Sequence, residues 1–327
     1  MQKAMTIMQC ARIFSLPMTI FSWLIIFTYA YIDSGNITYG LIALIGLCFA
    51  HLGTNLADDY FDYKNLIKQV GFDKKEYLKH SQKTKCRYLI NGTMKESQLI
   101  GLIFIHLSAA FACGLFLYFK CGIGILYYTL VGAFIVLLYP ILSRFCLSEI
   151  LVAIAYGPAL FGGVYYAMCG TYSSEVFILA IPSMIITVVL LYIHTIMDYQ
   201  FDLEEGKRTL SNLFNSQLES LVLLKIFLTL GYLSIFLLCI FDITDWQVFL
   251  AYLTIPLAVD LYNSMKEFSC NPESIPQLKW YHFPMENLKL FIKRNEASFM
   301  IRMFQSRNLM IYFSILLLIG ILLSLCL

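Results

Sequence analysis

The chain has 327 residues, of which 59% are hydrophobic and only 13% charged, with a mean hydropathy of +0.73. An average soluble protein carries about 25% charged residues, and a folded surface cannot hide so large an apolar fraction. The composition therefore excludes a soluble enzyme and a disordered chain. The net charge of +2 is too small to imply a nucleic-acid partner, and the ten scattered cysteines, without a C-x-x-C pair, indicate neither a disulfide framework nor a zinc site.

Apolar segments long enough to cross a bilayer recur along the whole chain. A spanning helix needs about 20 mostly apolar residues. The segments that meet this requirement are 14–32, 38–57, 98–119, 121–142, 149–168, 175–197, 219–241, 246–263 and 309–327. Gly157 and Pro158 interrupt the fifth of them, which membrane helices tolerate. The sequence predicts an all-α, polytopic membrane bundle of nine transmembrane helices, in a single domain over residues 1–327.

The distribution of Lys and Arg predicts the orientation of this bundle. Of the 23 Lys and Arg residues, all except Lys120 and Lys225 lie before the first span or in the loops after the even-numbered spans. Basic residues concentrate on the cytoplasmic side of membrane proteins. We therefore expect the N-terminus and the long loops 58–97 and 264–308 in the cytoplasm, and the C-terminus outside. A loose apolar stripe among basic residues over 286–304 predicts a helix on the inner membrane surface.

An acidic cluster closes the second span. The string N-L-A-D-D-Y-F-D contains Asn55, Asp58, Asp59 and Asp62. Spacings of three and four residues place these side chains on one face of a helix. An acid at the bilayer centre costs about 2.5–3.5 kcal/mol. These residues are therefore expected either to meet water at the cytoplasmic mouth or to share divalent cations.

A second acidic cluster follows the sixth span. Asp198 and Asp202 are one helical turn apart, and His194 lies one turn before Asp198. Mg²⁺ is commonly bound by one or two carboxylates together with substrate phosphates. A single acid at a helix end is more often a solvated boundary residue, but two clusters on one membrane face predict Mg²⁺ ions that bridge to a diphosphate.

Basic side chains near both clusters are suited to phosphate oxygens. Lys207 and Arg208 follow the second cluster, and Lys85 and Arg87 lie in the first long loop. Such groups bind phosphate through charge-assisted hydrogen bonds. Taken singly, each is better explained by the excess of positive charge in cytoplasmic loops. Asp260, inside the eighth span, has no evident partner.

The motifs N-x-x-D-D-x-x-D at 55–62 and D-x-x-x-D at 198–202 resemble the two aspartate motifs of the UbiA-type intramembrane prenyltransferases. The resemblance covers essentially the whole chain. Within the superfamily, the chain is most similar to the 1,4-dihydroxy-2-naphthoate polyprenyltransferases of menaquinone synthesis, through 55–62, S-E-I-L-V-A-I-A-Y-G-P at 148–158 and G-K-R-T-L at 206–210. The resemblance implies Mg²⁺-dependent transfer of a polyprenyl group from an allylic diphosphate to an aromatic acceptor. It also implies a bacterial inner membrane, with the active site facing the cytoplasm.

The resemblance further implies roles for individual residues. Those expected to be catalytic are Asp59, Asp62, Asp198 and Asp202. Those expected to bind Mg²⁺ are Asn55, Asp58, Asp59, Asp62, Asp198 and Asp202. Those expected to bind the diphosphate are Asn55, Arg87, Lys207 and Arg208. Those expected to contact the acceptor or the isoprenoid tail are Tyr139, Arg144, Glu149 and His194.

The chain departs from the family pattern after the first motif. The family usually has another Asp four to six residues beyond the position of Asp62. This chain has Leu66 and Lys68 there, and its next acid is Asp73. The departure leaves most of the expected Mg²⁺ ligands in place and raises the question of whether Asp73 replaces the missing acid.

A second departure concerns the acceptor. The second motif usually begins with Asn, where this chain has His194 and Thr195, and Met197 stands where the naphthoate branch often has Arg. A UbiA-type transferase with another acceptor, or a membrane terpene cyclase with none, is therefore an open alternative. A transporter is a third reading, but it would place ionisable groups near the bilayer midplane on broken helices, whereas these acids cluster at the inner mouth.

Overall fold

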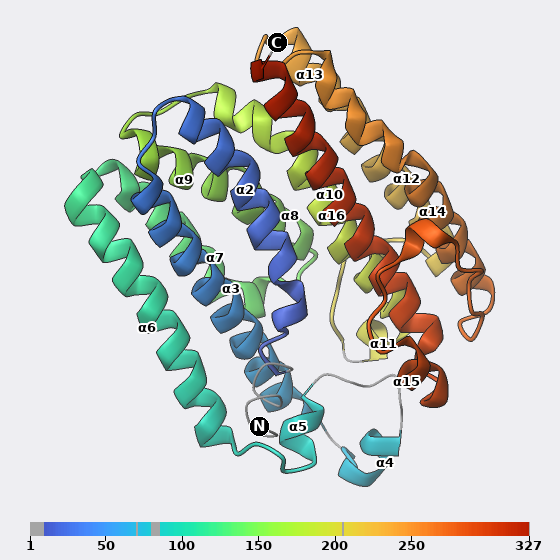
Figure 1. Ribbon diagram of the computed structural model, residues 1–327. Coiled ribbons are helices and arrows are strands. Elements are labelled where there is room, and N and C mark those ends of the chain that lie inside the picture. Colours follow the sequence, from blue (N-terminus) through green and yellow to red (C-terminus); the bar gives the residue numbers. More distant parts are fainter. Residues whose placement is uncertain (1–9, 70, 80–85, 205, 327) are drawn as a thin grey trace.

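A computed structural model describes residues 10–69, 71–79, 86–204 and 206–326. Within these ranges the chain is helical and contains no β-strand, only an isolated bridge between Phe145 and Arg208. Nine helical segments of the described chain are long and apolar enough to cross a membrane. They lie side by side in one bundle (Figure 1), which confirms the predicted fold class and number of spans.

The spanning segments comprise α2 (Leu16–Ile32), α3 (Ile37–Leu66), α6 (Glu96–Cys121), α7 (Gly124–Leu142), α8 (Ser148–Ile154) with α9 (Leu160–Cys169), α10 (Glu175–Met197), α12 (Gln217–Leu233) with α13 (Ile235–Ile240), a 3₁₀ helix (Trp246–Thr254) with α14 (Ile255–Cys270), and α16 (Ala297–Cys326). Shorter helices lie in the connections: α4 (Lys74–Lys79), α5 (Arg87–Ile90), α11 (Tyr199–Glu204) and α15 (Leu288–Lys293). We call the end of the bundle where α3, α10 and α14 finish the acidic end.

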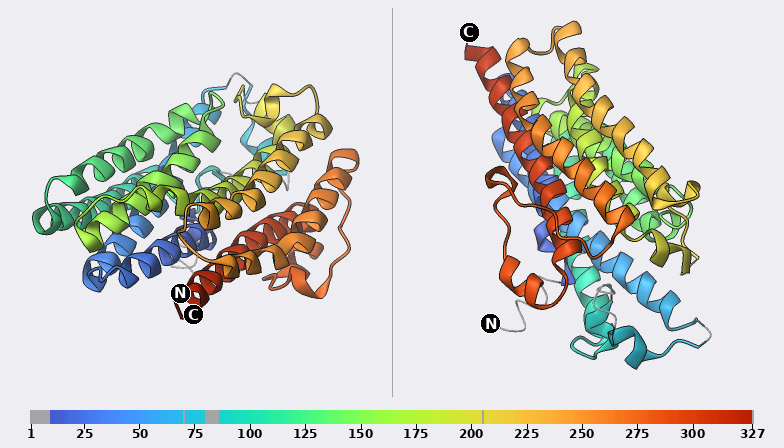
Figure 2. Two further views of the ribbon diagram at one scale, coloured as in Figure 1. Left: turned by 90° about the horizontal axis from the view of Figure 1, so that it is seen from above. Right: turned by 90° about the vertical axis from the view of Figure 1, so that its right-hand side faces the viewer.

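The centre of the bundle is α10. In its most apolar stretch 67% of the residues are buried inside the protein, against 6% for α6. α10 packs against α12, α16 and α2, and Tyr192, Ile193 and Ile196 have no exposed surface. Seen along the bundle (Figure 2, left), α6 and α14 lie at opposite edges. α6 therefore offers most of its surface to the surroundings, as expected of a lipid-facing helix.

The fifth span is broken where its glycine and proline predict. α8 passes into a π-helical turn, Ala155–Ala159, before α9 begins. Gly157 in this turn is not helical (φ −102°, ψ −107°), and Pro158 has no N–H to donate. A Cβ on Gly157 would lie 2.5 Å from the sulfur of Met184 on α10. The glycine thus permits both the kink and its close approach to the central helix.

Two helix boundaries differ from those predicted, both at the acidic end. α3 continues to Leu66, beyond the predicted limit at residue 57, and α16 begins at Ala297 rather than at 309. The single surface helix predicted over 286–304 is wrong. The chain leaves helical geometry at Asn295 (φ 57°), and Ile301 is fully buried in α16. Hydropathy misses both extensions because their polar side chains are satisfied by partners distant in sequence.

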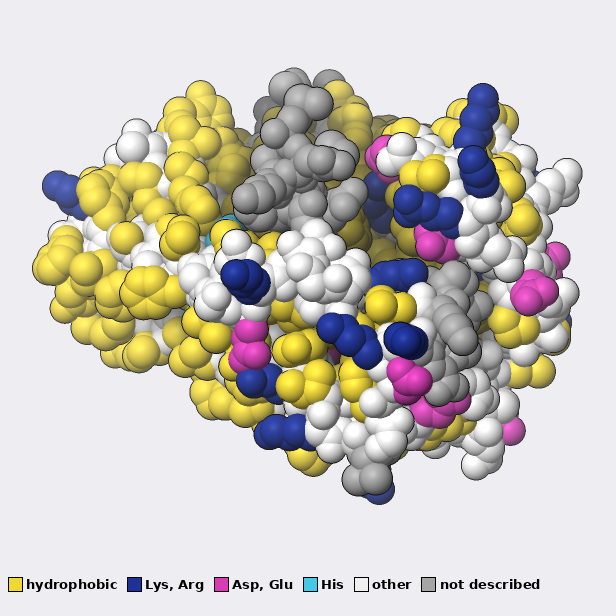
Figure 3. All heavy atoms as spheres, turned by 90° about the horizontal axis from the view of Figure 1, so that it is seen from below, with side chains coloured by type: hydrophobic (Ala, Val, Ile, Leu, Met, Phe, Trp, Pro, Cys, Tyr) yellow, Lys and Arg dark blue, Asp and Glu magenta, His cyan; other side chains and the backbone are white. Residues whose placement is uncertain are grey.

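The direction of the bundle across the membrane stays a prediction. Seen from the acidic end (Figure 3), most of the Lys and Arg side chains in view lie over the centre and the right part of this face, whereas hydrophobic side chains cover much of the left part. Basic residues concentrate on the cytoplasmic side of membrane proteins, so the acidic end is predicted to face the cytoplasm.

Cysteine labelling tests this orientation. Cys270 is exposed at the acidic end. In a chain whose other cysteines are replaced by Ala, a membrane-impermeant maleimide should label Cys270 only after the cells are permeabilised. The matched control is Tyr172→Cys in a cysteine-free chain, because Tyr172 is 58% exposed at the opposite end; it should react in sealed cells. The reverse pattern would place the acidic end outside.

Candidate functional site

The acids of the first cluster are buried at the end of α3 and are matched by two arginines. Asp58, Asp59 and Asp62 are 8%, 3% and 8% exposed. Arg12, in the turn before α2, forms an ion pair with Asp59, and its Nη2 lies 3.7 Å from an oxygen of Asp58. Nη2 of Arg144, in the turn after α7, lies 3.1 Å from Oδ1 of Asp62. Because an uncompensated buried charge is costly, these pairings explain how the acids remain inside the bundle.

Asp59 ties three parts of the chain together. Besides its ion pair with Arg12, its Oδ2 accepts a hydrogen bond of 2.9 Å from the hydroxyl of Tyr88 on α5, and its carbonyl accepts one from the thiol of Cys86. Burial and the charge of Asp59 both raise the pKa of Tyr88, so the phenol remains a donor. Burial opposes the charge of Arg12, but the carboxylates of Asp59 and Asp58 outweigh it and raise the pKa of Arg12.

Asn55 fastens the turn that carries Arg12. Its side-chain amide donates to the carbonyl of Ala11 at 3.3 Å and to Oγ of Ser15 at 3.2 Å. One turn earlier on α3, Nε2 of His51 lies 2.8 Å from the same Oγ. The structure thus gives Asn55 a positioning contact. Its role as a ligand of Mg²⁺ and of the diphosphate stays a prediction.

The second cluster combines one buried and one accessible acid. Asp202, on α11, is 1% exposed, and Nζ of Lys207 lies 3.9 Å from its Oδ1. The side chain of Asp198, at the end of α10, is 18% exposed. Its Oδ2 lies 3.3 Å from Nδ1 of His194, one turn earlier, as the helical spacing predicts.

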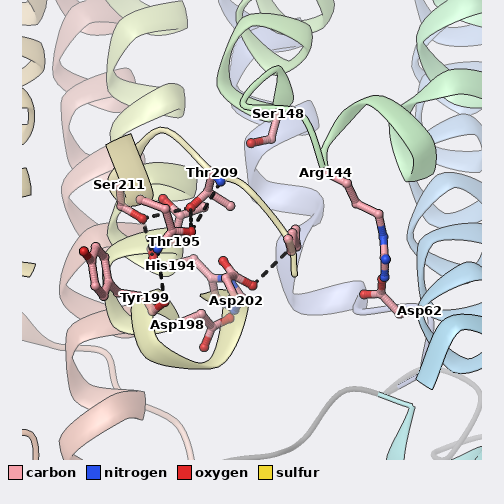
Figure 4. Close-up of polar contacts among 12 residues, drawn as sticks. Asp62, Arg144, Ser148, His194, Thr195, Asp198, Tyr199, Asp202, Thr209 and Ser211 are labelled. Carbon is pink, nitrogen blue, oxygen red and sulfur yellow. Dashed lines mark hydrogen bonds and ion pairs between the residues drawn. The ribbon is translucent and has the colours of Figure 1, made fainter. Parts of the chain in front are cut away.

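Two loops bring the clusters to neighbouring positions. The N–H of Arg208 donates to the carbonyl of Arg144 at 3.1 Å, and the N–H of Cys146 donates to the carbonyl of Arg208 at 2.9 Å. The turn after α7 and the loop after α11 therefore run side by side. Figure 4 shows the result: Asp62 with Arg144 lies on one side of the acidic end, and Asp202 lies on the other.

Buried hydroxyl groups hold the loop that contains G-K-R-T-L. Thr209 and Ser211 have no exposed surface. Oγ1 of Thr209 donates to Oδ1 of Asn212 at 2.8 Å, and Oγ of Ser211 donates to the carbonyl of Thr195 on α10 at 2.9 Å. The first bond closes a turn within the loop, and the second holds the loop against the central helix (Figure 4); together they set the position of Lys207.

Removal of one of these hydroxyl groups should lower stability. Thr209→Val keeps the shape of the side chain but removes a buried donor, and we expect a loss of about 1–3 kcal/mol. Thermal unfolding in nanodiscs measures it. The matched control is Thr93→Val, which removes an exposed hydrogen bond to Asn91 and should cost less than about 0.5 kcal/mol. Equal losses in the two variants would show that the loop is not held through Thr209.

The residues predicted to contact the acceptor lie around the two clusters. Glu149, in the first turn of α8, is 2% exposed and accepts hydrogen bonds from Ser148 (2.6 Å) and from Thr195 of α10 (3.3 Å). Tyr139 lies in the last turn of α7, and Arg144 lies in the turn that follows. The pairing of Arg144 with an acid of the first motif places it within the site, whereas contact of any of these residues with an acceptor stays a prediction.

The predicted diphosphate-binding bases separate into two groups. Lys207 contacts an acid of the second cluster. Arg87 instead donates to the carbonyl of Leu78 at 3.1 Å, and Arg208 is exposed. Lys85 lies outside the described residues. Asp73 is exposed and accepts a backbone N–H at 2.7 Å at the start of α4, so it caps that helix rather than joining the first cluster.

Arg12 and Tyr88 are the residues of this site that sequence reasoning missed. Arg12 counted only as a marker of orientation, although an arginine directly before the first span was a usable signal. Tyr88 is one of 22 tyrosines, and no spacing relates it to the motif.

The donor set fits Mg²⁺ that arrives with a substrate. Among residues 10–69, 71–79, 86–204 and 206–326, no three His, Cys, Asp or Glu side chains form a group that could hold a metal ion by themselves. Mg²⁺ usually takes only one or two carboxylates and completes its shell with water and substrate phosphates. Buried carboxylates on both sides of the acidic end provide that chemistry, and their neighbouring cations show that this end accommodates positive charge.

Comparison with known proteins identifies the family. Residues 15–280 match the UbiA prenyltransferase family, and the chain belongs to this family. A 4-hydroxybenzoate octaprenyltransferase of Francisella tularensis subsp. mediasiatica is 28% identical over 167 residues, which are 51% of this chain and 55% of that protein. The protein with this name from subsp. holarctica strain LVS matches with the same identity and coverage. The chain thus spans about half the length of the curated relatives that it matches.

Solved structures share the fold over nearly the whole chain. A UbiA homologue from Aeropyrum pernix K1 aligns with a TM-score of 0.59 at 18% identity, covering 94% of this chain and 98% of that one. A UbiA homologue from Archaeoglobus fulgidus, bound to GPP and Mg²⁺, aligns with a TM-score of 0.54 at 10% identity, covering 93% and 99%. At these identities the likeness shows the fold alone.

Proposed function

We propose that the protein is a Mg²⁺-dependent prenyltransferase that moves a polyprenyl group from an allylic diphosphate to an aromatic acceptor. One observation carries the proposal: the carboxylates of the two motifs, represented by Asp62 and Asp202, lie at one end of a membrane bundle, and each is beside a base. Family membership and the name of the curated relatives support it. We place the site at the cytoplasmic face of a bacterial inner membrane.

The site suits the chemistry of the leaving group. The bond between the prenyl carbon and the diphosphate oxygen breaks, a carbon–carbon bond to the ring forms, and the ring gives up one proton. Mg²⁺ would neutralise the charge that gathers on the departing diphosphate. The carboxylates of both motifs would hold the metal ions: Asp58, Asp59, Asp62, Asp198 and Asp202. Lys207 would donate to the diphosphate oxygens.

The acceptor that we propose is a hydroxylated aromatic carboxylic acid. The segments 148–158 and 206–210 favour a compound like 1,4-dihydroxy-2-naphthoate, as used in menaquinone synthesis. The relatives named for 4-hydroxybenzoate favour that smaller acid. Both acceptors require the same groups at the acidic end to bind the diphosphate. They differ in the size of the ring that the bundle must accommodate.

An acceptor screen tests the proposal. The protein in nanodiscs is incubated with Mg²⁺, a radiolabelled long-chain prenyl diphosphate and either acid, and prenylated product and released diphosphate are measured. We expect product with one of the two acids and none in EDTA. Diphosphate release without any acceptor would favour a terpene cyclase. If the protein shows no turnover with either acid and no Mg²⁺-dependent binding of the diphosphate, the proposed function is excluded.

A further inference from the structure

The segment 271–296, which joins α14 to α16 and which we call the strap, has an unusual distribution of polarity. Trp280 is 86% exposed, Ile275 56% and Phe283 43%. His282, between two of them in sequence, is 1% exposed. A loop in water buries apolar side chains and exposes polar ones. The strap departs from this rule at Ile275, Trp280, Phe283 and His282, which indicates apolar surroundings for the part of the strap that holds them.

Three polar side chains of the strap converge on Asp260 of α14. Its carboxylate accepts hydrogen bonds from Nζ of Lys279 (2.8 Å) and the hydroxyl of Tyr281 (2.7 Å), and it lies 3.0 Å from Nε2 of His282. Nδ1 of His282 accepts the backbone N–H of Lys279 at 3.2 Å. The proton of a neutral imidazole is therefore on Nε2, which donates to Asp260. The strap thus supplies the partners of an acid inside a span.

α16 holds the strap from the other side. Arg302 is fully buried, and its guanidinium donates to the carbonyl and the hydroxyl of Ser274 at 2.9 and 2.8 Å. The side-chain amide of Asn308 donates to the carbonyls of His282 (2.7 Å) and Pro284 (2.9 Å). Since α16 fixes the backbone of the strap and Asp260 of α14 fixes its polar side chains, the apolar side chains are held outward by the fold.

The position of the strap along the axis of the bundle follows from helix geometry. Lys266, the next charged residue along α14, lies about 9 Å nearer the acidic end than Asp260 does, at 1.5 Å per residue. A segment that bonds to Asp260 has therefore returned into the apolar part of the span. Figure 1 and the right view of Figure 2 agree: the strap turns back along the outside of α16 toward the middle of the bundle.

Basic residues occupy the end of the strap nearest the acidic end. Lys289 and Lys293 on α15 are exposed one turn apart, and Arg294 is exposed next to them. Ile292 is 53% exposed among them. Of the acids of the strap, Glu273 lies at its other end, and Glu286 forms an ion pair of 2.8 Å with Arg307 of α16. Glu296 follows Arg294 by two residues, so the basic residues still outnumber the acids at this end. Cations interleaved with exposed aliphatic side chains are typical of segments at a membrane surface.

We propose that the strap is a membrane-binding element that recognises anionic lipids. Trp280 and Phe283 insert at the boundary between headgroups and acyl chains, where aromatic side chains are enriched. Lys289, Lys293 and Arg294 bind lipid phosphates. This extends to residues 271–296 the membrane-surface position that the sequence predicts for 286–304, although not as a single helix. The inference does not rest on the proposed enzymatic activity.

Fluorescence of Trp280 tests the insertion. The protein carries Trp23→Phe and Trp246→Phe, so that Trp280 is the one tryptophan, and is placed in nanodiscs. Lipids brominated near the top of the acyl chain should quench Trp280 at least about twofold, and aqueous iodide should have little effect. The reference for a tryptophan in water is the variant Asn91→Trp in a chain free of other tryptophans, because Asn91 lies in an exposed turn. The proposed insertion would be overturned if iodide quenched Trp280 as strongly as it quenches the reference tryptophan and brominated lipid did not quench Trp280.

Spin-labelled lipids test the recognition of charge. The protein should bind spin-labelled phosphatidylglycerol in preference to phosphatidylcholine, and the triple variant Lys289→Gln, Lys293→Gln, Arg294→Gln should reduce this preference at least about twofold. The matched control, Lys68→Gln, Lys74→Gln, Lys75→Gln, removes the same charge from exposed positions in the other long loop and should change it less. Equal reductions in the two variants, or no preference in the parent protein, would overturn the proposed lipid recognition.

Discussion

The Asp202→Asn variant is expected to lose prenyl transfer by about 10²–10³-fold or more. The substitution keeps the shape of a side chain that is 1% exposed but removes the negative charge that faces Lys207. A neutral amide binds Mg²⁺ more weakly than a carboxylate does, so charge on the departing diphosphate is less well neutralised. Turnover measured as a function of Mg²⁺ concentration should show both a lower maximum and a higher Mg²⁺ requirement.

A carboxylate at the opposite end of the bundle is the control for Asp202→Asn. Asp33 accepts a hydrogen bond of 2.9 Å from Tyr165, and Asp33→Asn should leave turnover within about twofold, because it alters no charge at the acidic end. Asp62→Asn, in the first motif, should behave like Asp202→Asn. Full activity of Asp202→Asn in a correctly folded protein would show that Asp202 does not hold the metal.

The Arg12→Gln variant is expected to lose about 3 kcal/mol of stability when Mg²⁺ is absent, because breaking a buried ion pair leaves charge uncompensated. Arg12 is the cation beside both Asp58 and Asp59. Mg²⁺ carries positive charge to the same carboxylates, so it should restore part of the loss. Thermal unfolding in nanodiscs, in EDTA and in Mg²⁺, should show a larger stabilisation by Mg²⁺ in the variant than in the parent protein.

Arg208→Gln separates this effect from a general loss of positive charge. Arg208 is exposed at the same end, and its replacement should change stability by less than about 0.5 kcal/mol. An equal Mg²⁺-induced shift in Arg12→Gln and in the parent protein would mean that the metal does not reach Asp58 and Asp59. That result would confine the metal site to Asp62 and the second motif.

Properties that depend on neighbouring residues in the chain were predictable. The apolar spans follow from local hydropathy, and the break at Gly157 and Pro158 follows from the backbone chemistry of those residues. The face shared by Asp58, Asp59 and Asp62 follows from the helical repeat. Both motifs close even-numbered spans, so an up-and-down bundle must place them at one end, and the structure does so.

Properties that depend on distant partners were not predictable. Asp59 pairs with Arg12 across 47 residues and with Tyr88 across 29, and Asp62 pairs with Arg144 across 82. No local spacing encodes such contacts. The surface helix predicted over 286–304 was wrong for the same reason, because the burial of α16 depends on the helices around it.

The sequence by itself determined the nine apolar helices that are found in the described part of the chain and are long enough to cross a membrane, and the two carboxylate motifs at one end, because hydropathy and helical spacing are local properties of a chain. Only the tertiary structure decided which cations balance those carboxylates and how Asp260 is satisfied. Both depend on loops that return from distant parts of the chain to the bundle. In an apolar environment, a buried charge is stable only where such a partner reaches it.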